Sequence, residues 1–370
     1  MSARFLTVVL ERAFNMRDGF GREIDYMRIS VIDSCNLNCY YCNPCDNNEH
    51  CHALNILSVK EVLCIVRAAT RLGIKHFRLT GGEPLLHPQL DEMVLQIKKI
   101  SGVSSVSLTT NAVLLAQHAK WLKEAGIDSI NVSLDTIDAS EYERITKKPL
   151  LEEVKHGINA AIECGIRVKI NVVLTPQTDV VALTRYASKK GTDIRFIEMM
   201  PVGEGHTNGV EPYKKVIGTL SKLYGEPCRI NTEKTKEINS GNDKRKIPDN
   251  GPAEYYIFPE LGIRVGLIQA IHGKFCDTCN RIRVTADGRL MPCLGSSVTM
   301  DLVPNSWDFA DDAEKDFSIV RALRAAIKAK PGCHNFNDNA VTYTKTTETK
   351  TTEIEAAEVN AARNMSRIGG

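Results

Sequence analysis

The sequence predicts an α/β protein built around a parallel β-sheet, and two features of the chain support this fold class. Short runs of β-branched and other apolar residues recur through the first half of the chain, and stretches with the spacing of amphipathic helices lie between them. Strands that alternate with helices in this way form right-handed βαβ units around a parallel sheet. Periodicity alone leaves open whether the sheet is open or curves into a full or partial barrel.

The expected elements follow in chain order. Strands are expected at 27–32, 76–80, 105–109, 129–134, 167–174 and 193–199, and helices at 58–72, 89–100, 114–125, 150–163 and 180–189. Gly73, Gly126 and Gly165 stand just beyond the ends of three of these helices, where a glycine commonly ends a helix. The alternation stops after Pro201.

A second, smaller unit is expected in the later part of the chain. Residues 233–250 are polar and rich in lysine, which is typical of an exposed loop, and a strand pair is expected at 254–258 and 263–268. The dipeptide Asp287-Gly288 predicts a hairpin turn between strands at 281–285 and 289–291. We therefore expect three parts: a core at 1–240, a second unit at 241–340, and a flexible tail at 341–370 that ends in Gly369-Gly370.

Charge and hydropathy exclude some classes of protein. The 370 residues include 47 basic and 45 acidic side chains, so the net charge of +2 provides no global field for nucleic acid or an anionic membrane. No apolar run approaches the roughly 20 residues that span a bilayer. A cytoplasmic protein is the simplest expectation, although Arg4, Arg12 and Arg17 near the start leave an organelle-targeting segment open.

Twelve cysteines in a chain of this length, without a secretory signal, indicate metal or redox chemistry rather than a disulfide framework. Two groups stand out. The first is Cys35-x3-Cys39-x2-Cys42, which directly follows the first expected strand, and the second is Cys276-x2-Cys279-x13-Cys293. The carboxyl ends of parallel strands are where α/β proteins place their active sites.

Each group supplies three thiolates, one fewer than a closed metal site requires. A four-iron cluster held by three cysteines leaves one iron open to a small ligand, whereas structural zinc normally takes four protein ligands. Zinc stays open as an alternative at both groups, with Cys45 as the fourth ligand of the first and His272 as the fourth ligand of the second.

The wider sequence context gives both cysteine groups a specific resemblance. The first group, followed at the second strand by Thr80-Gly81-Gly82-Glu83-Pro84, resembles the radical S-adenosylmethionine (SAM) superfamily. The segment 275–288 around the second group closely resembles the GTP 3′,8-cyclase family of molybdenum cofactor biosynthesis. The likeness extends to 25–42, 78–84, 109–111, 131–135, 169–173, 194–198 and the Gly-Gly tail. It implies a partial (β/α)6 barrel with a smaller C-terminal domain that carries a second iron–sulfur cluster.

The resemblance also implies a set of site residues and partners. The implied SAM ligands are Tyr41, Gly81, Gly82, Glu83, Ser133 and Met200, and the implied GTP ligands are Arg28, Arg78, Thr109, Lys169, Arg195, Arg281 and Arg283. Catalytic roles would belong to Arg28, Arg281, Arg283, Gly369 and Gly370, and the six cysteines of the two groups would hold two [4Fe-4S] clusters. The implied partners are a reductant such as flavodoxin or ferredoxin, a second copy of the chain in a homodimer, and a downstream cyclic pyranopterin monophosphate synthase.

Elementary chemistry agrees with the implied substrate. A triphosphate carries about four negative charges, and guanidinium groups bind phosphate oxygens in bidentate fashion. Arg281 and Arg283 are two apart on an expected strand and so share one face of it. Arg28, Arg78, Lys169 and Arg195 belong to four other expected strands, so a barrel would direct them into one cavity.

Some residues depart from the family pattern. The family usually has Thr and Arg where this chain has Ile32 and Ser34, Lys at His76, and Gly at Ala112. A neutral His76 would remove one positive charge near the triphosphate. Two other functions therefore stay open, a radical SAM paralogue acting on a peptide or another nucleotide and a zinc-dependent binding module. The surplus cysteines Cys45 and Cys51 have no assigned role.

Overall fold

The computed structural model describes residues 16–42, 55–202, 210–230, 251–296, 299–302, 312–334 and 336. Its strands are β1 (Tyr26–Ser30), β2 (His76–Thr80), β3 (Ser105–Thr110), β4 (Ser129–Ser133), β5 (Arg167–Val173), β6 (Asp193–Ile197), β7 (Cys228–Arg229), β8 (Glu254–Ile257), β9 (Arg264–Ile268), β10 (Arg281–Val284), β11 (Arg289–Met291) and β12 (Met300–Asp301). Its α-helices are α2 (Val59–Arg71), α3 (Leu90–Lys98), α4 (Leu115–Glu124), α5 (Ala139–Thr146), α6 (Leu151–Glu163), α7 (Val180–Lys189), α8 (Gly218–Tyr224) and α9 (Asp312–Lys328).

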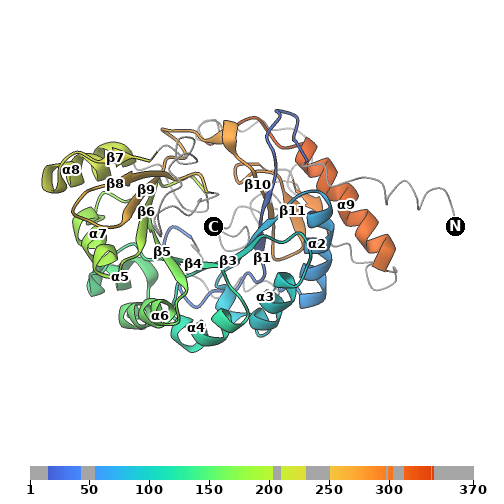
Figure 1. Ribbon diagram of the computed structural model, residues 1–370, viewed down its shortest axis with the longest axis horizontal. Coiled ribbons are helices and arrows are strands. Elements are labelled where there is room, and N and C mark those ends of the chain that lie inside the picture. The colour runs from blue at the N-terminus through green and yellow to red at the C-terminus, as the bar shows by residue number, and fades with distance from the viewer. Residues whose placement is uncertain are drawn as a thin grey trace, which may run out of the picture.

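The strands form one curved sheet that is open along one side (Figure 1). Strands β1 to β6 lie in sequence order and pair in parallel, and the order across the whole sheet is β12-β11-β10-β1-β2-β3-β4-β5-β6-β9-β8-β7. The six expected strands are therefore confirmed, and the sheet is the partial barrel that the resemblance implied. Their ends differ from the expected ranges by no more than a few residues, which is the usual uncertainty where helices and strands fray.

The later part of the chain extends both edges of this barrel. Strand β9 pairs in parallel with β6, while β10 pairs in parallel with β1 at the opposite edge. The two expected strand pairs are present, as β8 with β9 and as the β10–β11 hairpin, which turns at Gly288 with a φ of 77°. The expected boundary at residues 240 and 241 and the expected tail at 341–370 lie outside the described residues.

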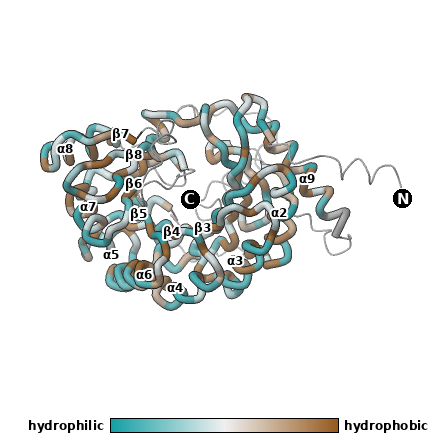
Figure 2. Tube along the Cα trace, viewed as in Figure 1, coloured by the Kyte–Doolittle hydropathy of each residue, from teal (hydrophilic) through white to brown (hydrophobic). Residues whose placement is uncertain are grey.

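Local signals in the sequence explain where the helices begin and end. Ser58 and Glu61 form a capping box at the start of α2, because each side chain accepts a hydrogen bond from the backbone of the other residue. Gly73, Gly126 and Gly165 follow α2, α4 and α6 with φ between 69° and 89°, as expected for glycines that end helices. Along the Cα trace the helices alternate between hydrophobic and hydrophilic positions (Figure 2).

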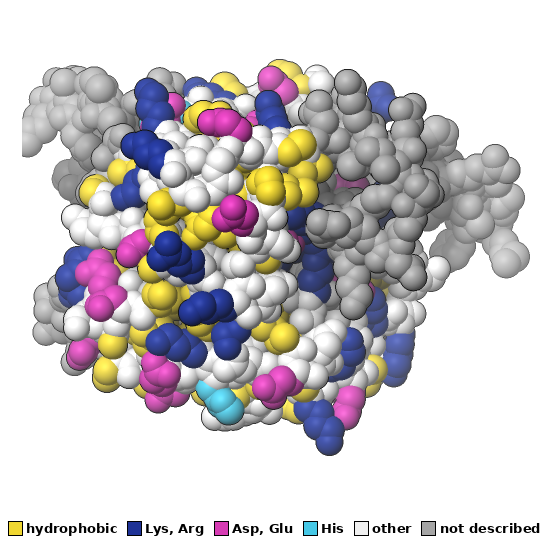
Figure 3. Space-filling model, turned by 60° about the vertical axis from the view of Figure 1, so that its left-hand side comes forward, with side chains coloured by type: hydrophobic (Ala, Val, Ile, Leu, Met, Phe, Trp, Pro, Cys, Tyr) yellow, Lys and Arg dark blue, Asp and Glu magenta, His cyan; other side chains and the backbone are white. Residues whose placement is uncertain are grey.

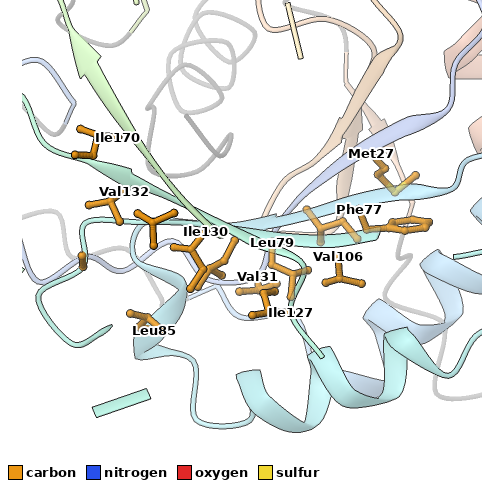
Figure 4. Packing of buried hydrophobic residues seen from close by; sticks show 14 of the residues in the cluster. Met27, Val31, Phe77, Leu79, Leu85, Val106, Ile127, Ile130, Val132 and Ile170 are labelled. Carbon is orange, nitrogen blue, oxygen red and sulfur yellow. The ribbon is translucent and has the colours of Figure 1, made fainter. Parts of the chain in front are cut away.

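The hydrophobic core lies between the sheet and the surrounding helices. Phe77, Leu79 and Val106 are fully buried, and their side chains extend from the strands toward the helical layer (Figure 4). Burying side chains of this size stabilises the fold by about 1.5–3 kcal/mol each. The inner face of the barrel is different, because polar and charged side chains from several strands point into it.

On the face of the molecule that Figure 3 shows, basic and acidic side chains are interspersed. Among the helices that the structure describes, none has both the length and the apolar character of a membrane span.

Candidate active site

A cavity of about 300 Å³ lies inside the barrel and reaches the loops at the carboxyl ends of the strands. Both cysteine groups line it, and so do residues from β1, β2, β3, β4, β5, β6, β9 and β10. Parallel α/β folds collect functional side chains at this end because every parallel strand delivers its following loop there. The sequence-predicted residues that line the cavity are Arg28, Cys35, Cys39, Tyr41, Cys42, Arg78, Gly81, Gly82, Glu83, Thr109, Ser133, Arg195, Met200, Cys276, Cys279, Arg281, Arg283 and Cys293.

The first cysteine group occupies the loop after β1. Burial raises the pKa of the Cys35 thiol to about 11, and burial together with the neighbouring Cys35 raises the pKa of Cys42 to about 12. The pKa of Cys39 is raised in the same direction by burial and by the charge of Cys42. Three buried thiolates repel one another, so this group needs a cationic centre before it can ionise, and an iron–sulfur cluster fits that requirement.

Close backbone contact fixes the position of Cys35. The amide of Gly82 donates to the carbonyl oxygen of Ile32 at 2.7 Å, and the amide of Glu83 donates to the carbonyl oxygen of Ser34 at 2.8 Å. A Cβ atom on Gly82 would lie 2.1 Å from the Ser34 oxygen, so only glycine permits this approach. Ile32 and Ser34 contribute their backbones to these bonds, and their departure from the family pattern leaves the bonds in place.

Glu83 is buried near the first cysteine group. Its carboxylate accepts hydrogen bonds from Thr110 Oγ1 at 2.6 Å, from the Asn111 amide at 2.7 Å and from the Leu85 amide at 3.1 Å. Burial nevertheless raises its pKa to about 7. Asn111 extends the network toward the cysteines, since its side-chain amide lies 3.8 Å from the Cys35 sulfur.

Asp135, at the carboxyl end of β4, holds the loop from the other side. The Tyr41 hydroxyl donates to its Oδ2 at 2.5 Å, and the Val173 amide donates to its Oδ1 at 2.7 Å. Burial raises the pKa of Asp135 to about 6. The backbones of Asn38 and Tyr40 also donate to the last turn of α5. The segment after β2, the carboxyl end of β4 and helix α5 therefore all position this loop.

The second cysteine group lies around the start of β10, whose first residue, Arg281, is in register with the first residue of β1. Burial opposes ionisation of Cys279, but the nearby charges of Arg281 and Lys330 outweigh it and lower the pKa of this thiol to about 7. Arg22, which does not line the cavity, contacts the backbone of this group. Its guanidinium forms a buried ion pair with Asp18 and donates to the Cys276 carbonyl at 2.7 Å.

The zinc alternative at the second group names His272 as its fourth ligand. His272 does not line the cavity that contains Cys276, Cys279 and Cys293, and its Nδ1 contacts the carboxylate of Glu198. Among the described residues, no three His, Cys, Asp or Glu side chains are arranged to hold a single metal ion. Cys45, the candidate fourth ligand of the first group, lies outside the described residues.

Three arginines stand side by side across adjacent strands. Arg28 on β1 is in register with Arg283 on β10 and with Arg78 on β2. Burial, with the charges of Arg283 and Arg78, lowers the pKa of Arg28, and burial with the charge of Arg281 lowers the pKa of Arg283 to about 10. Guanidinium groups remain protonated in proteins, so this row concentrates positive charge in the cavity and suits a polyanionic ligand.

Arg195 on β6 is held by two asparagines. Its Nε donates to Asn171 Oδ1 at 2.9 Å, and its Nη2 donates to Asn131 Oδ1 at 2.5 Å. The Thr109 hydroxyl and the Asn131 amide nitrogen are buried without a hydrogen-bond partner among the described residues. A buried polar group without a partner is costly, and Thr109 lines the cavity, so its hydroxyl is available to a bound ligand.

Not every sequence-predicted residue reaches the cavity. Lys169 is buried on β5 but does not line it, and His76 lies outside it, with its Nδ1 bonded to Ser105 Oγ at 2.8 Å. Gly369, Gly370, Cys45 and Cys51 lie outside the described residues. Asp135 and Lys330 line the cavity without having been predicted as site residues. Asp135 could have been found as the acid directly after an expected strand, whereas no local pattern marks Lys330.

Comparison of the sequence with known proteins identifies two families along the chain and several similar enzymes. Residues 29–183 match the Radical SAM superfamily, and residues 192–336 match the family Molybdenum Cofactor Synthesis C. A protein from Clostridium perfringens strain SM101 called GTP 3′,8-cyclase is 35% identical over 324 residues, which cover 87% of this chain and 95% of the relative. A GTP 3′,8-cyclase from Peptoclostridium acidaminophilum is 37% identical over 328 residues, covering 87% and 94%.

Solved structures share the fold at low sequence identity. Streptococcus suis SuiB bound to S-adenosylmethionine has a TM-score of 0.53 at 14% identity, with 75% of this chain and 63% of that chain covered. The same protein bound to precursor peptide SuiA has a TM-score of 0.54 at 14% identity, covering 86% and 69%.

The partial barrel, the cysteine loop after β1 and the matching superfamily define a radical SAM enzyme, whose cofactors are SAM and iron–sulfur. Its relatives are similar along almost their whole length and at more than a third of positions. The chain belongs to the GTP 3′,8-cyclase family.

Proposed function

We propose that this protein converts GTP into (8S)-3′,8-cyclo-7,8-dihydroguanosine 5′-triphosphate, a reaction of molybdenum cofactor biosynthesis. The observation that carries the proposal is that one cavity receives both cysteine groups and the arginine row of β10, β1 and β2. The names of the relatives and the match to Molybdenum Cofactor Synthesis C support it.

Each cysteine group has a proposed occupant. Cys35, Cys39 and Cys42 would hold one [4Fe-4S] cluster next to SAM, and Cys276, Cys279 and Cys293 would hold a second. When bound, the first cluster and SAM supply one-electron radical chemistry. The tight contact of Gly82 with Ser34 leaves backbone, rather than side chain, facing the SAM site, and Tyr41, Glu83, Ser133 and Met200 complete its proposed lining together with Gly81.

The arginines have the task of binding and orienting GTP. Arg28, Arg78 and Arg283 would bind phosphate oxygens, and Arg281 would lie beside the second cluster, where its guanidinium stacks 5.0 Å from the centre of the Phe275 ring. Arg195 is oriented in advance by Asn171 and Asn131, so little freedom is lost when a ligand binds. The Thr109 hydroxyl would gain a partner, and Lys169 would contribute positive charge from its buried position on β5.

Holding both ends of GTP fixes the ribose within reach of the SAM site. Such orientation converts an encounter between two molecules into a reaction within one complex, and the apolar side chains that line the cavity exclude water. We further propose that the Gly369-Gly370 tail enters the cavity during turnover.

The wider setting of the reaction is also a proposal. The division into a barrel at 1–240, a second unit at 241–340 and a tail at 341–370 follows the sequence. The protein would work in the cytoplasm as a homodimer, take electrons from a reductant such as flavodoxin or ferredoxin, and pass its product to a cyclic pyranopterin monophosphate synthase.

The test is a reconstitution under anaerobic conditions. Purified protein should hold about eight irons per chain if both groups carry four-iron clusters, and little zinc. Incubation with SAM, dithionite and GTP should yield 5′-deoxyadenosine and the cyclised nucleotide. Turnover of ATP or a peptide in place of GTP would contradict the assignment in favour of a paralogue, and stoichiometric zinc with little iron would favour the binding module. Replacing Gly370 should lower turnover and leave the iron content unchanged.

A further inference from the structure

Lys330 is a lysine buried next to the second cysteine group. It follows the C-terminal end of α9, it is 2% exposed, and it lines the cavity. Its ammonium group donates to the carbonyl oxygen of Arg281 at 2.8 Å and to that of Pro292 at 2.9 Å. These carbonyls belong to residues that lie two positions after Cys279 and directly before Cys293. The lysine therefore bridges the two backbone segments that carry these cysteines.

The charge of Lys330 has no acidic partner among the described residues. No carboxylate within the described part of the chain forms an ion pair with it, and its two hydrogen-bond acceptors are neutral carbonyls. A buried cation is costly unless a negative group lies nearby. A candidate is the thiolate of Cys279, because the charge of Lys330 lowers the pKa of this thiol.

We propose that Lys330 is the buried counter-cation of the second iron–sulfur cluster and sets its reduction potential. Three thiolates and a four-iron cluster carry a net negative charge, and reduction adds one more electron to it. A fixed positive charge inside the protein stabilises the more negative, reduced state and so raises the potential. Lys330 also binds the carbonyl oxygens of both cysteine segments, so it contacts the backbone close to Cys279 and Cys293.

The inference rests on the proposed second cluster, and its test separates the two. The full-length chain with Cys35, Cys39 and Cys42 all replaced by Ala retains only the second cysteine group, so every iron–sulfur signal then comes from that group. In this background we would reconstitute Lys330→Met, Lys330→Gln and Lys330→Arg and measure iron content and the reduction potential by a redox titration monitored by electron paramagnetic resonance. Lys328→Met removes an equal charge from an exposed position two residues away and is the matched control.

Lys330→Met and Lys330→Gln should shift the potential to more negative values, whereas Lys330→Arg and Lys328→Met should leave it close to that of the parent chain. The Gln variant can still donate hydrogen bonds, so it carries the test if the Met variant fails to bind iron. Four irons per chain with an unchanged potential in the Gln variant would overturn the role of Lys330. A parent chain without any cluster would instead overturn the proposed second cluster itself.

Discussion

The hydroxyl of Tyr41 donates to the Oδ2 of Asp135 at 2.5 Å, and this bond joins the first cysteine loop to the carboxyl end of β4. Both side chains line the cavity, and the carboxylate has one further donor, the Val173 amide. The loop therefore depends on a bond between residues that are far apart in the sequence.

Tyr41→Phe should destabilise the cluster-free protein by about 1–3 kcal/mol, because it leaves a buried carboxylate with one donor fewer. The pKa of Asp135 should then rise further above about 6, since the lost bond had stabilised its charged form. Urea unfolding measures the first effect, and iron content at the first group measures the cost to the loop. Tyr40→Phe, at a neighbouring exposed ring, is the control. Equal stability of the two variants would contradict the role of the bond.

Gly82→Ala should abolish iron binding at the first cysteine group and SAM binding with it. The new Cβ atom would lie 2.1 Å from the Ser34 carbonyl oxygen, so the backbone before Cys35 would have to move. Iron analysis and calorimetric titration with SAM would detect the loss. Gly218→Ala in α8 is the matched control, because its Cβ atom meets no other atom within 4 Å. Normal iron content in the Gly82 variant would show that the loop tolerates the displacement.

Ala112→Gly should stabilise the protein by about 0.5–1 kcal/mol. Ala112 has a φ of 65°, a left-handed conformation that costs an L-residue about 1–2 kcal/mol, part of which glycine loses again as chain entropy. Here the departure from the family pattern has a physical consequence. Thermal unfolding should be measured for this variant and for Ala119→Gly, which should lose about 1 kcal/mol of stability in the middle of α4. The two substitutions should therefore change stability in opposite directions. A destabilised Ala112→Gly would refute the strain.

The contribution of Glu83 to the free energy of unfolding should fall as pH rises from about 4.5 to about 7, because this carboxyl is protonated in the folded chain over this range and ionised in the unfolded chain. The carboxyl alone accounts for a fall of about 3 kcal/mol, complete above its folded pKa. Glu83→Gln should flatten the slope in cluster-free protein. Asp135 titrates in the same direction with a pKa of about 6, so adding Asp135→Asn should flatten the slope further. Identical slopes in wild type and both variants would exclude this linkage.

Local patterns in the sequence predicted the elements that have local causes. The capping box of Ser58 and Glu61 and the glycine after α2 are read directly from neighbouring residues, and the expected helix matches the observed one closely. Helix α5 escaped prediction because it is short, yet its last turn accepts the backbone hydrogen bonds of the cysteine loop. Helices α8 and α9 were likewise missed.

The site was predictable to the extent that its residues belong to compact motifs. Cys35, Gly82 and Arg283 were found in this way, and all three line the cavity. Lys330 belongs to no motif, and only the folded chain brings it to Cys279. His76 shows the opposite limit, because the resemblance suggested a place near the triphosphate, whereas this residue lies outside the cavity beside Ser105.

The pairing of β1 with β10 has a consequence for the order in which the molecule assembles. Asn280, next to β10, donates to Asp25, next to β1, across a separation of 255 residues. During synthesis, one edge of β1 therefore stays unpaired until β10 has been made. Contacts of such long range slow folding, and an exposed strand edge is prone to mispairing. The first cysteine loop follows β1, so its thiols leave the ribosome long before the segment that carries the second cysteine group is synthesised.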